Sequence, residues 1–69
     1  MIVSGKISVK AILKERKRDI ECVYILETHK DPEARYVLSI SKGLKIVRCD
    51  RKTLDELAGN TSHGGYLVK

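Results

Sequence analysis

The sequence predicts an α/β protein, a three-layer α/β/α sandwich with a largely parallel four-stranded sheet. Apolar runs alternate with segments that carry helix start and stop signals, in the order β-α-β-α-β-α-β, which places helices on both faces of such a sheet. The apolar run at 20–26 lacks clean alternation, which is typical of a strand covered on both faces. The chain has 69 residues, and a chain this short buries only about 60 % of its unfolded surface, so residues 1–69 are expected to form one domain.

The N-terminal segment predicts a short strand followed by an amphipathic helix. Residues 1–3 are apolar, and Ser4 and Gly5 let the chain turn, with the Ser4 hydroxyl as a helix cap. A helix over about 6–17 fits the pattern that follows. Its apolar face carries Val9, Ile12 and Leu13. Arg16 projects near this face, so it either extends along it or marks the point where the helix frays.

The middle of the chain predicts a central strand at 20–26, a helix and a further strand at 44–49. Asp31 is expected to cap the helix, with Pro32 at the first helical position, where its missing N–H costs nothing. The helix is predicted to stop at Gly43. Its apolar stripe is formed by Tyr36, Val37 and Ile40.

The last third predicts a short helix and a closing strand. Asp50 is a suitable cap for the helix, and Gly59 is a suitable end. Its inward residues are Leu54 and Leu57. A turn-rich loop at 60–65 leads to a fourth strand at 66–68, and the glycines of this loop are expected to supply positive φ angles.

Positive charge is concentrated in one segment. The net charge is +5, and residues 6–18 hold six bases against one acid, while the rest of the chain is balanced. The bases are Lys6, Lys10, Lys14, Arg16, Lys17 and Arg18, and the acid is Glu15. Such clustering indicates a polyanion partner, although solubility alone also accounts for a charge of this size.

Four lysines of the first helix share one stripe beside the apolar face. They are Lys6, Lys10, Lys14 and Lys17, with Arg18 directly after them. Acids that would neutralise them at i+4 are missing, which favours a nucleic-acid surface over an ordinary solvated face. The tyrosines, Tyr24, Tyr36 and Tyr66, all fit core or half-buried positions. Recognition should therefore depend on phosphates and RNA shape more than on base stacking.

Enzyme motifs are not found. The turn Ser4-Gly5-Lys6 has the place of a P-loop, but it lacks a second glycine upstream and is followed by Ile7, which excludes nucleotide hydrolysis. The amide groups at the start of the helix could still hold a phosphate next to Lys6. His63 has no Ser/Asp or Cys/Asp partner set, so we expect no catalytic residues.

The two cysteines, Cys22 and Cys49, lack CxxC spacing and are interpreted as reduced, buried thiols of a cytoplasmic protein. Together with His29 and His63 they match no zinc spacing, so we expect no metal. The chain also lacks the roughly 18 consecutive apolar residues of a membrane span, which predicts a soluble domain.

The order of several short motifs resembles the N-terminal substrate-binding domain of SpoU-type RNA ribose 2′-O-methyltransferases. The motifs are Gly5, the helix 9–13, the strand 23–26, the strand 44–47, the run 50–57 with the pattern D-R-x-x-L-D-x-L, and His63-Gly64-Gly65 in place of H-Q-G. The likeness covers essentially the whole chain. Gly64 stands where the family has glutamine, and Ser8 where many members have histidine, so no role carries over at these two positions.

The resemblance implies an L30e-like sandwich with a mixed sheet, which recognises rRNA or tRNA and passes it to a separate knotted catalytic domain that binds S-adenosylmethionine. It implies no cofactor in this chain, and an excised, monomeric domain whose catalytic partner domain is absent. The RNA-binding residues expected are Gly5 for the turn, Lys6, Lys10, Lys14, Lys17 and Arg18 as phosphate contacts, and His63 at the edge of the surface. The alternative is a docking or scaffold domain whose basic helix contacts its own catalytic domain or a partner.

Overall fold

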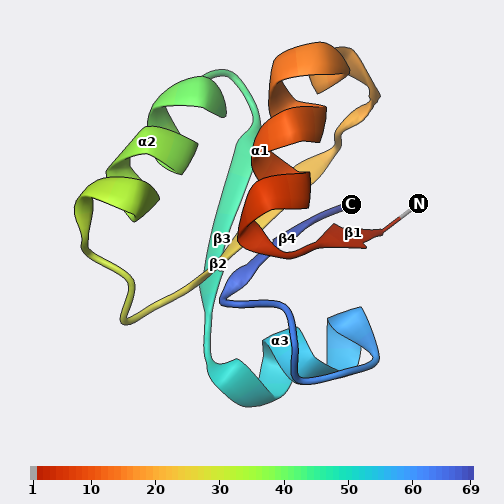
Figure 1. The fold of residues 1–69 in the computed structure, drawn as a ribbon, viewed down its shortest axis with the longest axis vertical. Coiled ribbons are helices and arrows are strands. Elements are labelled where there is room, and N and C mark those ends of the chain that lie inside the picture. Colours follow the sequence, from red (N-terminus) through yellow and green to blue (C-terminus); the bar gives the residue numbers. More distant parts are fainter. Residues whose placement is uncertain (1) are drawn as a thin grey trace.

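Strands and α-helices alternate along residues 2–69, the part of the chain that the computed structural model describes (Figure 1). The elements are β1 (Val3–Ser4), α1 (Lys6–Glu15), the short 3₁₀ helix η1 (Lys17–Asp19), β2 (Cys22–Leu26), α2 (Pro32–Ile40), β3 (Lys45–Cys49), α3 (Arg51–Ala58) and β4 (Tyr66–Val68). This order confirms the predicted alternation. Within this range, none of the helices has the length and apolar composition needed to cross a membrane.

The strands form one mixed sheet in the order β1-β4-β2-β3. β2 and β3 are parallel, with Val23 opposite Ile46, whereas β4 is antiparallel to both of its neighbours, with Val68 opposite Val23 and Val3. The α/β sandwich and its mixed sheet are therefore confirmed, and β2 is central as predicted. The expectation of a mostly parallel sheet is wrong, because only one of the three strand pairs is parallel.

The antiparallel entry of β4 follows from the position of α3. A parallel connection needs an element that carries the chain back along the whole sheet. α3 has only eight residues and lies at the end of the sheet where β3 finishes (Figure 1). The chain therefore enters β4 from that same end, where the Leu26 amide donates to the Gly65 carbonyl over 2.9 Å.

Two apolar clusters hold the layers together, one on each face of the sheet. On the first face α1 and α2 cover the strands. This cluster contains Val9, Leu13, Ile20, Val23, Ile25, Val37, Tyr66 and Val68. On the second face α3 places Leu54 against Leu26 and Leu67. Consecutive strand residues alternate between the clusters, as the pleat of a strand requires.

The helix starts follow the predicted capping residues with one exception. The predicted end of the second helix at Gly43 is wrong, because α2 ends at Ile40 with Ser41 as its C-cap. Asp31 accepts from the Ala34 amide over 2.9 Å, and Asp50 accepts from the Thr53 amide over 2.8 Å. The prediction that the Ser4 hydroxyl caps α1 is wrong. Gly5 is the N-cap there, at φ 98°, and makes no side-chain cap bond. A left-handed φ at this position accounts for glycine in the turn.

Candidate nucleic-acid interface

The basic stripe lies on α1 and is partly neutralised by α2. Lys10 forms an ion pair with Glu33, and the two side chains are 27 % and 33 % exposed. The hydrogen bond from Lys10 is the main cause that lowers the pKa of Glu33. Lys6 and Lys14 are exposed, without a carboxylate partner among residues 2–69. Lys10 is thus less available to an RNA phosphate than Lys6 and Lys14.

Tyr36 of α2 lies under the same lysines. Its ring is 5.3 Å from the Lys14 Nζ and 5.9 Å from the Lys10 Nζ, measured to the ring centroid. The residue is 39 % exposed, so the expectation that it is core or half-buried is wrong, whereas Tyr66 is buried and Tyr24 half-buried as expected. Because ammonium groups occupy the ring face, cation–π contacts take the place that a stacked base would need.

Lys17 and Arg18 leave the helical stripe because α1 ends earlier than predicted. The helix stops at Glu15, and Arg16 is its C-cap at φ −135°, so Arg16 marks the helix end. Lys17 and Arg18 belong to η1. They line a surface cleft of about 610 Å³ between η1 and the turn that joins α2 to β3.

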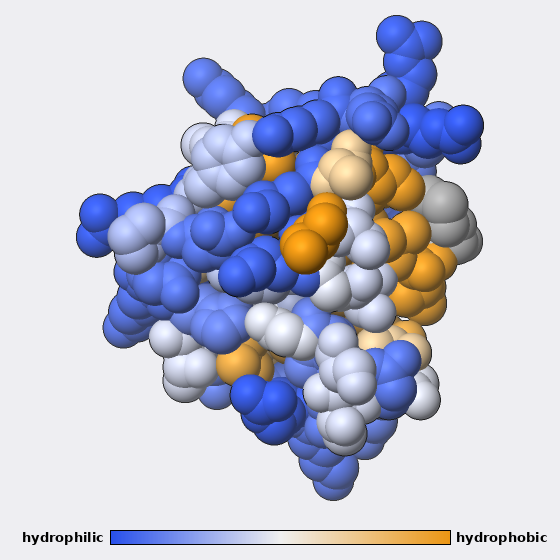
Figure 2. Space-filling model, viewed as in Figure 1, coloured by the Kyte–Doolittle hydropathy of each residue, from blue (hydrophilic) through white to orange (hydrophobic). Residues whose placement is uncertain are grey.

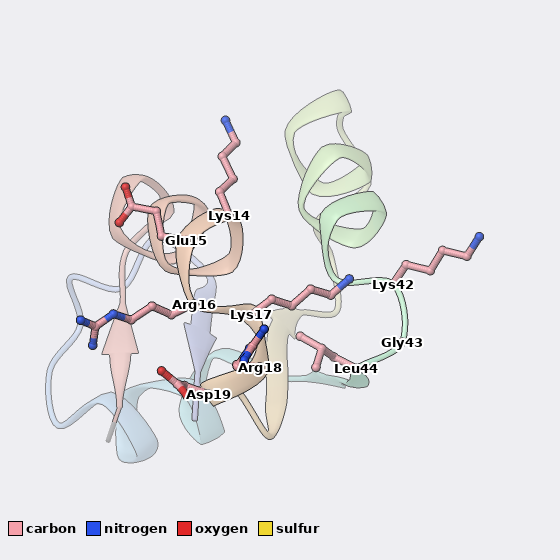
Figure 3. A pocket seen from close by; sticks show the side chains of 9 residues that line it. All are labelled: Lys14, Glu15, Arg16, Lys17, Arg18, Asp19, Lys42, Gly43 and Leu44. Carbon is pink, nitrogen blue, oxygen red and sulfur yellow. The ribbon is translucent and has the colours of Figure 1, made fainter.

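The walls of this cleft, which we call the η1 cleft, are mainly cationic. It is lined by Lys14, Glu15, Arg16, Lys17, Arg18, Asp19, Lys42, Gly43 and Leu44. Figure 3 shows Lys17 reaching from η1 toward Gly43 and Leu44, with Arg18 beside it, whereas Arg16 and Asp19 point to the other side. Neither Lys17 nor Arg18 is paired with an acid within residues 2–69.

The face that carries α1 and α2 is mostly hydrophilic in Figure 2, with hydrophobic residues interrupting it. Ile7 of α1 is 78 % exposed, and Ile2 is 47 % exposed. The polar character and the free cations of this face suit a charged ligand more than an apolar one.

His63 does not lie on the surface. Its side chain is fully buried, so the expectation that it sits at the edge of an RNA surface is wrong. Its Nδ1 accepts from the Gly65 amide over 2.9 Å, and its Nε2 lies 2.5 Å from the Asp55 Oδ1. Because Nδ1 accepts, the proton of the neutral ring is on Nε2 and is donated to Asp55. His63 therefore ties the last loop to α3.

The glycines after His63 are required by backbone geometry and by space. Gly64 has φ 62° and Gly65 has φ 89°, which confirms the predicted positive angles. A Cβ at residue 65 would lie 2.1 Å from the His29 Nε2. His29 stacks on the Tyr66 ring at 5.0 Å between centroids, and its Nε2 is 2.9 Å from the Gly64 carbonyl oxygen. The loop is thus packed closely between two histidines.

The cysteines are free thiols, with Cys22 buried as expected and Cys49 half-buried. Burial is the main cause that raises the pKa of the Cys49 thiol, and Asp50 adds to it. Across residues 2–69, the histidines, cysteines and acids do not gather in threes as metal ligands would.

Sequence reasoning missed Glu33, Tyr36 and Lys42 as parts of this surface. All three come from α2 or the turn after it, and reach the basic segment only because the two helices pack side by side. The one signal in the sequence is the acid at the start of the second helix, and such an acid is already explained as the usual complement of a helix dipole.

A small α/β/α domain with a cationic cleft is suited to binding a polyanion. Comparison with protein families gives the particular class: residues 2–68 match the model of the RNA 2′-O ribose methyltransferase substrate-binding domain. The chain belongs to this family. It matches none of the curated proteins with which it was compared. The domain binds the substrate and is not the catalytic one, so this chain alone is not catalytic.

Two motifs that carry the family resemblance meet in the structure. Asp55 belongs to the D-R-x-x-L-D-x-L run, and His63 opens the H-G-G loop. Their hydrogen bond joins α3 to the segment before β4. At these two positions the motif residues support the fold.

Proposed function

We propose that this chain recognises a structured rRNA or tRNA for a cytoplasmic 2′-O-ribose methyltransferase, and that a separate catalytic domain modifies the RNA. The family match over residues 2–68 is the observation that carries this proposal. The free cations of α1 and η1 support it, because phosphate contacts supply most of the affinity of an RNA-binding surface.

The phosphate contacts proposed are Lys6, Lys14, Lys17 and Arg18, with Lys10 a weaker contact because Glu33 already pairs with it. Gly5 sets the turn that begins α1. His63 acts from the interior, by holding the loop before β4. The domain is expected to act as a monomer and to contact its catalytic domain.

We expect the chain to bind a structured RNA hairpin with steep salt dependence. Each phosphate-contacting cation adds roughly one unit to the slope of log affinity against log salt, so four free cations give a slope of about −4. Fluorescence anisotropy with labelled hairpin, titrated at several salt concentrations, measures it. Absence of binding at low salt, or a slope near zero, would contradict RNA recognition.

S-adenosylmethionine is assigned to the catalytic domain, and the η1 cleft does not fit it. The cofactor carries a cationic sulfonium, which the bases lining the cleft disfavour. Calorimetric titration of the cofactor into this chain is expected to give no binding heat. Clear 1:1 binding would show that cofactor recognition lies in this domain.

A further inference from the structure

The η1 cleft brings cations of two chain segments to one opening. Lys17 and Arg18 reach it from η1, and Lys42 belongs to the opposite wall, with its side chain extending away from η1 in Figure 3. We infer that this cleft is a dedicated site for a phosphodiester of the RNA backbone, and that Lys42 belongs to it. The inference rests on the proposed function. It places the main RNA contact at the end of α1 and not along the whole lysine stripe of that helix.

Charge balance favours an anionic ligand. The cleft is lined by five bases and two acids, a net charge of +3. The carboxyl ends of α1 and α2 lie next to it, and each helix end contributes about −0.5 of an elementary charge, or about −1 together. The helix dipoles therefore offset only part of the net positive charge of the cleft. Lys10 is paired with the carboxylate of Glu33, whereas Lys17 and Arg18 have no carboxylate partner within the described residues.

The lining points to phosphate and ribose and not to a base. A volume of about 610 Å³ is within the range of small-ligand sites. Among residues 2–69, no aromatic side chain lines the cleft and Leu44 is the one large apolar residue there, so a base would find no ring in this range to stack on. Arg18 can bind a phosphate with two parallel hydrogen bonds, and Lys17 adds a point charge. Such contacts are independent of sequence.

The test compares two charge-matched double variants of this chain. Lys17→Gln with Arg18→Gln removes two cations of the cleft. Lys45→Gln with Lys52→Gln removes two exposed cations from β3 and α3. Affinity for an RNA hairpin should fall by about tenfold or more in the cleft pair, with the salt slope reduced by about 2, but by less than about threefold in the control pair. Lys42→Gln alone should reduce the slope by about 1.

Each other outcome decides against the cleft. Equal losses in the two pairs, with RNA still bound by the unmodified chain, overturn the cleft and leave the proposed function standing. Absence of RNA binding by the unmodified chain overturns both. If the cleft pair is less stable to unfolding but binds RNA with unchanged affinity, these cations only stabilise the helix ends. Displacement of the RNA by micromolar inorganic phosphate would assign the cleft to a free anion.

Discussion

Replacing His63 by alanine is expected to lower the free energy of unfolding by about 3 to 4 kcal/mol. The substitution opens a cavity in a fully buried position and leaves the Gly65 amide and the Asp55 carboxylate without their partner. A chain of this length is stabilised by roughly 3 to 10 kcal/mol in total, so the substitution should remove about a third of the stability or more. Urea unfolding followed by circular dichroism measures the loss.

Two further variants separate the hydrogen bonds from the buried volume. Asp55→Asn keeps an oxygen acceptor at the same place and should cost about 1 kcal/mol. Glu56→Ala, at an exposed neighbouring position of α3, should change stability by less than about 0.5 kcal/mol. A His63→Ala variant as stable as Glu56→Ala would show that His63 does not hold the loop to α3.

Replacing Leu54 by alanine is expected to cost about 3 kcal/mol. Leu54 is the fully buried residue of α3 in the second apolar cluster, where it packs with Leu26 and Leu67. A leucine-to-alanine change in a core loses both the transfer free energy and the packing around the cavity. Denaturant unfolding measures the loss.

Cys49 gives a local readout of the same change, because it packs against this cluster. When α3 loosens, the Cys49 thiol should become more exposed, its pKa should fall back toward its ordinary value, and both changes speed its reaction with a thiol reagent. Glu56→Ala serves again as the control. An unchanged Cys49 rate together with unchanged stability in Leu54→Ala would contradict the packing of α3 on the sheet.

Local signals in the sequence were enough for the element order and for some of the helix ends. Asp31 and Asp50 cap because a short carboxylate can reach the amide three residues later, which depends only on neighbouring residues. Gly59 ends α3 in the left-handed conformation for an equally local reason. The central position of β2 could be predicted because its residues are apolar on both faces.

Features that depend on distant contacts could not be predicted in this way. The direction of β4 depends on where α3 lies relative to the sheet, which the alternation of elements does not specify. The pairing of Lys10 with Glu33 joins residues 23 positions apart. A histidine in a glycine-rich loop resembles an exposed one in the sequence, because the sequence does not show that Asp55, eight positions earlier, accepts its hydrogen bond.

Recognition of RNA by the face that carries α1 and η1 is tested most directly by nuclear magnetic resonance. The isotope-labelled chain is titrated with an RNA hairpin while its backbone amides are followed. We expect the largest shift changes in residues 14–19 and 42–44, which line the η1 cleft, and little change in α3. The largest changes in α3, or none at saturating RNA, would contradict RNA recognition by this face.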